Sequence, residues 1–161
     1  SLPYPAAMTG DFFLAASQLV DEGEVAVVVG EIVDDNPTQY GAAGFLPGPI
    51  VRSPLSAIVV GWLANAGGDG VFSADDVLLY GEVLAHEVGH YAGLFHPVES
   101  AYDSWDALDD TPECPGEAMC EAMLGENLMF PYSICDGGTC VHATTITDDQ
   151  RAVMHRYTGT R

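Results

Sequence analysis

The stretch from Glu82 to Pro97, EVLAHEVGHYAGLFHP, concentrates side chains that can bind a metal ion and use it. His86 and His90 are four residues apart, so on a helix their imidazoles project from one face and can share a zinc ion. Glu87 follows the first histidine, where its carboxylate can accept a proton from water activated by the metal. This spacing predicts a zinc site with a general base beside it.

A third ligand and a turn complete the predicted site. Gly93 is placed to end the helix, because glycine adopts the left-handed conformation of a helix C-terminal turn without steric cost. The chain can then turn back and bring His96 to the metal. Three protein ligands leave one coordination position open, which a catalytic zinc needs and a structural zinc generally lacks. A helix that carries two histidines and a glutamate by chance is the alternative, but it does not explain why three of only five histidines lie at ligand spacing.

The pattern His-Glu-x-x-His-x-x-Gly-x-x-His resembles that of the metzincin clan of zinc proteases, and residues 84–96 are most similar to the pappalysin family. The resemblance extends over about residues 42–157. It implies an α+β fold in which a small twisted mixed sheet is backed by the active-site helix, and an irregular, disulfide-bonded C-terminal subdomain ends in a helix. It also implies one catalytic domain, with an N-terminal subdomain of residues 1–93 and a C-terminal subdomain of residues 94–161.

Three segments ahead of the metal motif predict the elements that position it. Residues 9–21 carry apolar side chains at helical spacing, which predicts a short amphipathic helix. Residues 24–33 and 56–62 are β-branched and almost continuously apolar, which is typical of buried strands. Because this region is short for the clan, either the sheet is reduced or residues before Ser1 are missing.

Capping boxes predict where two helices begin, because each pairs a hydroxyl with an acidic or amide side chain three residues later. Ser73 with Asp76 predicts the start of the metal-binding helix. Thr147 with Gln150 predicts the start of a helix over residues 147–157.

Residues 40–49, YGAAGFLPGP, are too rich in glycine and proline for an interior strand, and they predict a short edge strand with a loop. In the metzincins, the edge strand beside the cleft pairs with an extended substrate. The resemblance therefore implies this role for residues 42–46, and backbone pairing of this kind is a known mode of peptide capture.

Two residues downstream are candidates for the surroundings of the zinc. Asn127-Leu128-Met129 resembles the metzincin Met-turn, which sets Met129 beneath the metal, where a soft thioether fills irregular space. Met119 and Met123 are the alternatives. In several metzincins a tyrosine two residues past the methionine leans on the zinc or on the reaction's oxyanion. Tyr132 stands three residues past it, so it is either a catalytic residue or a pocket residue.

An acidic loop follows the metal motif, and carboxylates are hard oxygen ligands that suit calcium. Its segment from Asp109 to Pro112 resembles the Asp-Thr-Pro segment that helps to bind calcium in pappalysin-like enzymes. A solvated acidic loop is the alternative. The candidate calcium ligands are Asp103, Asp106, Asp109, Asp110 and Thr111.

The four cysteines all follow the metal motif, in a segment rich in glycine and proline and poor in helix signals: Cys114, Cys120, Cys135 and Cys140. Their even number predicts two disulfides and an oxidising compartment, with a second zinc site as the alternative. Four cysteines allow three pairings. The resemblance favours Cys114 with Cys135 and Cys120 with Cys140.

Composition excludes several classes of function. The chain of 161 residues suffices for one domain, and its 48% of hydrophobic residues exclude a disordered chain. Only 4 Lys and Arg stand against 24 Asp and Glu, a formal net charge of -20, so nucleic acid is excluded as a partner. The acidity favours solubility in a salty or calcium-containing medium, with bound calcium and attraction of basic substrates as alternatives. The sequence contains no run of 18 apolar residues that would predict a membrane span, and the residues from Ser1 onward do not resemble a signal peptide.

Together these features predict a secreted, monomeric, zinc-dependent endopeptidase that acts on a protein or peptide substrate. Calcium is the predicted second cofactor. The alternative is a binding or scaffold module of the same fold that carries zinc or calcium but turns over little substrate. The intact Glu87 argues against this alternative, because a module without catalysis has no chemical need for it.

Overall fold

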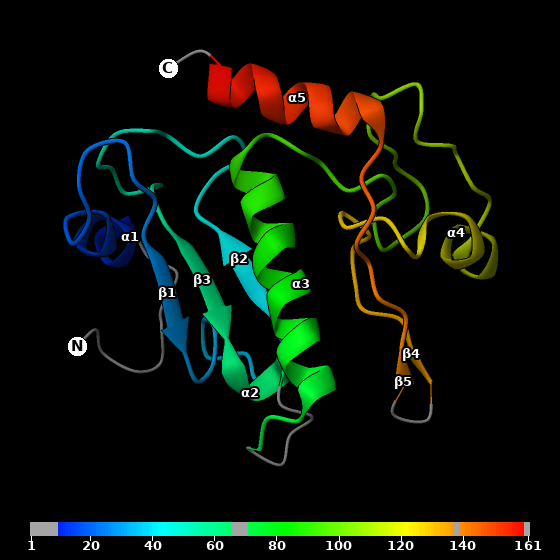
Figure 1. Ribbon diagram of the computed structural model, residues 1–161, viewed down its shortest axis with the longest axis horizontal. Helices are drawn as coiled ribbons and strands as arrows, with labels where there is room; N and C mark the ends of the chain where they lie inside the picture. The colour runs from blue at the N-terminus through cyan, green and yellow to red at the C-terminus, as the bar shows by residue number, and fades with distance from the viewer. Residues whose placement is uncertain (1–9, 66–70, 137–138, 160–161) are drawn as a thin grey trace. The chain divides into compact units, whose positions relative to one another are not determined.

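The computed structural model describes residues 10–65, 71–136 and 139–159 (Figure 1). The chain divides after Tyr91 into two compact units. The sequence predicted this boundary two residues later, after residue 93. The predicted α+β class with a small mixed sheet is confirmed. The elements follow in this order: α1 (Gly10–Ser17), β1 (Val27–Gly30), β2 (Gly41–Ala43), β3 (Ile58–Gly61), α2 (Trp62–Asn65), α3 (Ala74–Tyr91), α4 (Glu117–Leu124), β4 (Cys135–Asp136), β5 (Thr139–Cys140) and α5 (Asp148–Gly159).

The first unit is built on a three-stranded sheet in which β3 is the central strand. β1 runs parallel to β3, with Val27 opposite Ile58, and β2 runs antiparallel to β3 on its other side. All four residues of β3 are buried, in agreement with the continuous apolar run in the sequence. Both predicted strands are confirmed. They are shorter than residues 24–33 and 56–62, in the second case because α2 already begins at Trp62.

Helices α1 and α3 both pack on this sheet. The predicted helix at residues 9–21 is confirmed but ends at Ser17, and residue 9 lies outside the described residues. Helix α3 packs against β2 and β3 (Figure 1). One buried cluster joins α1 to the sheet: Phe12, Phe13, Ala16, Ala26, Val33, Ala57 and Val59.

Helix α3 carries the metal motif and has well-defined ends. At its start, the Ser73 N–H donates to the Asp76 carboxylate (2.7 Å) and the Asp76 N–H donates to the Ser73 hydroxyl (3.1 Å). The predicted capping box is therefore confirmed, and these bonds lower the pKa of Asp76. Just past its end, Gly93 has a φ of 101°, the left-handed conformation that the sequence predicted.

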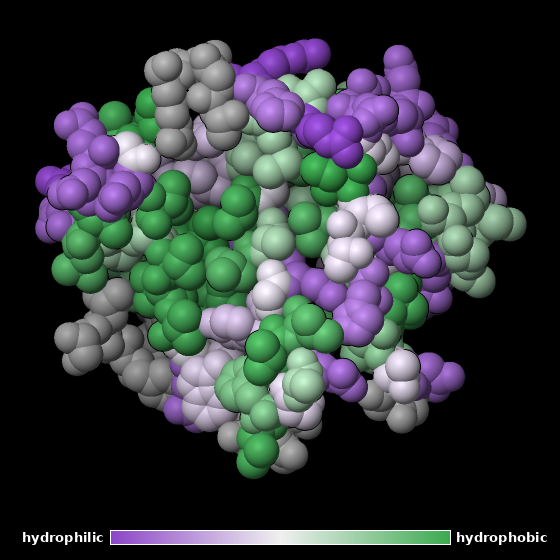
Figure 2. All heavy atoms as spheres, viewed as in Figure 1, coloured by the Kyte–Doolittle hydropathy of each residue, from purple (hydrophilic) through white to green (hydrophobic). Residues whose placement is uncertain are grey.

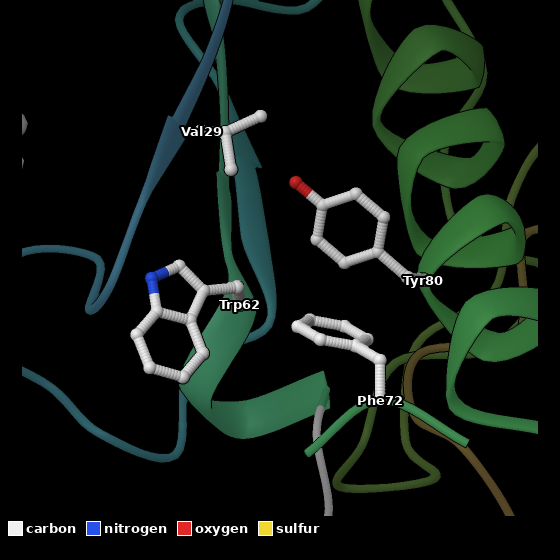
Figure 3. A pocket seen from close by; sticks show the side chains of 4 residues that line it. All are labelled: Val29, Trp62, Phe72 and Tyr80. Atoms are coloured by element: carbon white, nitrogen blue, oxygen red, sulfur yellow. The ribbon is translucent and has the colours of Figure 1, made fainter. Parts of the chain in front are cut away.

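Part of the first unit leaves apolar side chains exposed. Val29, Trp62, Phe72 and Tyr80 line an open hollow, and the Tyr80 hydroxyl points into it from the helix side (Figure 3). Hydrophobic side chains gather on this face of the molecule, over the strands (Figure 2). The Tyr80 hydroxyl is buried and has no hydrogen-bond partner among the described residues. Burial raises the pKa of this phenol.

The second unit is more irregular and has a small core of its own. Helix α4 was not predicted, because the sequence around it is rich in glycine and proline and the helix has only 8 residues. At the start of α5, Thr147 and Gln150 exchange backbone-to-side-chain hydrogen bonds of 2.9 and 3.2 Å, which confirms the second capping box. The core cluster of this unit comprises Val98, Cys114, Cys120, Leu124 and Phe130.

Two disulfides are present, as the number of cysteines predicted, but the predicted pairing of the cysteines is wrong. Cys114 is bonded to Cys120 and Cys135 to Cys140. Local structure explains both bonds. Helix α4 brings Cys120 back to within 5.1 Å of Cys114, measured between Cα atoms. The hairpin of β4 and β5 sets Cys135 directly opposite Cys140.

None of the described helices combines the length and the apolar character that crossing a bilayer requires.

Candidate metal centre

Three imidazoles lie close together at the end of α3. The rings of His86 and His90 come from successive turns of the helix, with centroids 4.6 Å apart and planes at 88° to each other. His96 follows the turn at Gly93, and one ligand nitrogen of each histidine lies within 4.8 Å of the other two. Within the described part of the chain, no other three His, Cys, Asp or Glu side chains come together in this way.

The donor set of this triad fits a zinc ion. Three neutral imidazole nitrogens are ligands that zinc prefers, at about 2.0–2.1 Å. The three side chains are all half-buried, so water can reach a fourth position. The triad therefore has the ligand number and type of a catalytic zinc site rather than of a closed structural one.

Glu99 orients the third histidine. Its carboxylate lies 3.1 Å from Nδ1 of His96. A carboxylate at Nδ1 favours the tautomer that carries a proton there, which leaves Nε2 as the acceptor for a metal. A short turn holds Glu99 in place, because its carbonyl accepts from Tyr102 (2.8 Å) and its N–H donates to Ser104 (2.9 Å). This role of Glu99 was not predicted, although its spacing of three residues from His96 was a usable signal.

Glu87 is held between the helix and the edge strand of the first unit. Its side chain is 7% exposed, and burial raises its pKa to about 7, against the opposing effect of a hydrogen bond from the Ala43 backbone. Gly41 makes this approach possible, because a Cβ there would lie 2.9 Å from Cγ of Glu87. The predicted edge strand at residues 42–46 is observed as β2, one residue earlier and shorter.

The predicted Met-turn is a tight turn in the second unit. Met129 is fully buried, and its N–H donates to the Asn127 side-chain oxygen (2.9 Å). The Phe130 N–H donates to the Asn127 carbonyl (2.9 Å) and closes the turn. The alternatives, Met119 and Met123, are about half exposed. Burial in a turn thus favours Met129 over them, while its place beneath a zinc stays a prediction.

Gln150 supports this turn, and the sequence analysis missed that role. Its side-chain oxygen accepts from Asn127 Nδ2 (2.9 Å), and its own Nε2 donates back to the Asn127 oxygen (3.2 Å). Gln150 is fully buried, so this amide pair is shielded from water. The same side-chain oxygen also accepts from the Thr147 N–H, which couples the turn to the start of α5.

Tyr132 is engaged within the second unit. Its hydroxyl donates to the Glu121 carboxylate (3.1 Å) and contacts the Tyr102 hydroxyl. Burial, followed by these hydrogen bonds, raises the pKa of the Tyr132 phenol. Its ring packs on the core cluster of the unit. These contacts give Tyr132 a packing role, and its catalytic role stays a prediction.

The predicted calcium ligands are not assembled as a set. Asp106 accepts hydrogen bonds through one oxygen, from the Leu108 N–H (3.1 Å) and from the Thr111 hydroxyl. Its other oxygen is buried, without a partner among the described residues, and burial raises the pKa of this carboxyl. Asp103 and Asp109 are exposed.

Asp110 is a hydrogen-bond acceptor at the start of α5. Its carboxylate accepts the Asp149 N–H (2.9 Å) at the start of α5, and this bond is the main reason that its pKa is lowered. No three of the four predicted carboxylates come within ligand distance of one another in the described residues. The calcium site therefore stays a prediction.

The chain matched no protein-family model, no curated protein and no solved structure in three comparisons with known proteins.

Proposed function

We propose that the protein is a secreted, zinc-dependent endopeptidase of the metzincin type, most similar to the pappalysins. One observation carries the proposal: three imidazoles and a buried carboxylate lie on a single eleven-residue segment, with the ligand nitrogens within 4.8 Å of one another. The two disulfides support an oxidising compartment, and hence secretion.

A zinc ion held by His86, His90 and His96 would supply Lewis-acid activation of a water molecule and of the scissile carbonyl. Glu87 accepts the proton that this water releases as its oxygen attacks the carbonyl carbon. It then donates that proton to the nitrogen of the leaving amine. Burial raises the pKa of this carboxyl to about 7 in the absence of a metal, and the charge of a bound zinc ion would lower it toward the ionised form that accepts a proton.

The substrate is proposed to be an extended peptide. β2 is an edge strand of the sheet, and its residue Ala43 donates a hydrogen bond to Glu87. An edge strand offers unpaired backbone groups to which another strand can add. A peptide paired with β2 would therefore pass close to the general base. The net charge of -20 favours substrates with basic residues.

Glu87→Gln tests this proposal, because the amide keeps the size of the side chain and cannot act as a base. We expect hydrolysis of casein or a peptide library to fall by about 10²–10⁴-fold while one zinc per chain is retained. Glu82→Gln, on the same helix, is the matched control and should stay active.

Two other outcomes would redirect the assignment. Near wild-type hydrolysis by Glu87→Gln would remove Glu87 from its role as general base. A wild-type protein that binds one zinc but cleaves no peptide in the library would support the binding or scaffold module instead.

A further inference from the structure

We propose that Tyr91 is a positioning residue, which couples the zinc-binding turn of α3 to the loop that follows β2. The inference rests on the proposed function, because it concerns the same site. Tyr91 directly follows His90 and is 3% exposed, so it cannot itself contact a substrate.

The side chain of Tyr91 ends in a small hydrogen-bonded cluster. Its hydroxyl donates to the Pro49 carbonyl and lies 2.9 Å from the Ser56 hydroxyl. The Ser56 hydroxyl also reaches the Pro49 carbonyl, at 3.2 Å. Ser56 is 2% exposed, so water does not compete for these bonds. Buried hydrogen bonds of this kind define one geometry, because breaking them leaves polar atoms unsatisfied.

The backbone of Tyr91 is held by the same loop. The Gly48 N–H donates to the Tyr91 carbonyl (2.9 Å), which belongs to the last turn of α3. Gly48 also lies against the tyrosine ring, where a Cβ would come within 2.0 Å of a ring carbon. The loop therefore holds the residue at three points: the carbonyl, the ring and the hydroxyl.

These contacts fix the rotation of the helix end about its axis. Glu87 and Tyr91 are four residues apart and share one face of α3. Glu87 contacts Gly41 and Ala43, while Tyr91 contacts Gly48 and Pro49. This face of α3 is therefore attached to one continuous segment of the chain, residues 41–49. The direction of the His90 imidazole, and the path of the chain into the turn that leads to His96, depend on this attachment.

Zinc binding and the order of the loop should consequently be linked in both directions. An ion that holds the imidazoles in one arrangement favours the helix end that the loop recognises, and the ordered loop favours the ion by the same free energy. Because the loop continues from the strand proposed to bind substrate, Tyr91 would connect the metal to the substrate-binding edge.

Tyr91→Phe tests this link, because it removes only the hydroxyl. Tyr80→Phe is the matched control on the same helix, since the Tyr80 hydroxyl has no partner among the described residues. A coupling between two linked sites typically changes affinity by about 5-fold or more. We expect a loss of this size for Tyr91→Phe in chelator competition, and wild-type affinity for Tyr80→Phe.

Hydrogen exchange at the Gly48 amide provides a readout that a purely structural role would not change. Zinc should slow this exchange in the wild-type protein and in Tyr80→Phe, and should slow it less in Tyr91→Phe. Gly48→Ala perturbs the same contact from the loop, because it displaces the Tyr91 ring without a substitution in α3, and it should also weaken zinc binding.

The possible failures are distinguishable. Wild-type zinc affinity in both Tyr91→Phe and Gly48→Ala would overturn the positioning role and leave the proposed function intact. Absence of zinc binding in the wild-type protein would overturn the proposed function, and the positioning role with it. If Tyr91→Phe does not fold, Gly48→Ala alone decides, with unchanged affinity and unchanged zinc-dependent exchange at residue 48 counting against the link.

Discussion

Glu87 is a carboxyl group whose surroundings oppose its ionisation. It is almost fully buried on the sheet side of α3, and one hydrogen bond, from the Ala43 backbone, partly offsets the cost of burying its charge. The glycine at residue 41 is what allows the backbone to come so close. In the absence of a metal, this carboxyl therefore holds its proton up to about neutral pH.

This burial should make the metal-free protein less stable as the pH rises. The carboxyl has a pKa of about 7 when folded against 4.5 as the ordinary value, so the folded state binds the extra proton between these limits. The stability it contributes is fully present below pH 4.5 and is lost as the pH rises through 7. A shift of this size corresponds to about 3 kcal/mol.

Glu87→Gln should abolish this dependence, because the amide does not titrate. Urea unfolding of both proteins in the presence of a chelator, between pH 4.5 and 8, measures the difference in free energy of unfolding. We expect the variant to gain stability relative to the wild type as the pH rises. A difference that stays constant over this range would show that Glu87 is ionised normally in the folded protein.

The proposed zinc ligands could be predicted because their arrangement is local. His86 and His90 follow from helical spacing and Gly93 from the turn that it must make, all within one stretch of chain. Tyr91 could not be assigned a role, because its contacts with Gly48 and Pro49 appear only once the conformation of the loop is known. The disulfide pairing was wrong for a related reason: the bonds follow a short helix and a hairpin whose sequences carry weak signals.

At the scale of elements, both capping boxes were predictable because they pair residues only three apart. The ends of β1 and β3 were not, since strand length depends on which neighbour is available for pairing. Gln150 shows that local contacts could be predicted and long-range contacts could not. Its bond to Thr147 is local and was predicted, whereas its bonds to Asn127 span 23 residues and were not.

Gln150→Ala should therefore loosen α5 and the turn at Met129 together. The substitution removes the cap of the helix and leaves both polar atoms of the buried Asn127 amide without this partner. Unsatisfied buried groups cost about 1–3 kcal/mol, and loss of a cap adds roughly 1 kcal/mol. We expect the free energy of unfolding of the second unit to fall by about 2–4 kcal/mol.

Arg151→Ala is the control on the same helix. It removes an ion pair with Asp148 in which both side chains are more than half exposed, a kind of pair that contributes little. Chemical denaturation of the two variants measures how much free energy of unfolding the buried amide pair contributes beyond that of an exposed side chain on α5. Equal losses in both would mean that the Asn127 contact does not hold the turn.

At the scale of the whole molecule, each unit has a core and a tryptophan of its own. Trp62 belongs to the first unit and Trp105 to the second. Both disulfides are in the second unit, which has the smaller cluster of buried apolar residues. His96 belongs to the second unit as well, and Val98, two residues later, is part of its core. The proposed third zinc ligand thus depends on a region that its disulfides help to stabilise.

The two disulfides should differ in importance, although they close loops of similar length. Loop closure alone accounts for about 2 kcal/mol in each case. Cys114 and Cys120 are buried in the core cluster, whereas Cys135 lies exposed in the hairpin of β4 and β5. Replacing the first pair by alanine also creates a cavity, so we expect it to lower the unfolding temperature of the second unit more than replacement of the second pair.

Fluorescence can assign this effect to a unit. In a Trp62→Phe background, Trp105 reports on the second unit, and it pairs with Val98 in a β-bridge, so it lies next to the affected core. In a Trp105→Phe background, Trp62 reports on the first unit, whose transition we expect to remain unchanged by either double alanine variant. An equal shift of both signals would mean that the units unfold as one cooperative structure, and that the buried disulfide stabilises the environment of all three histidines and not of His96 alone.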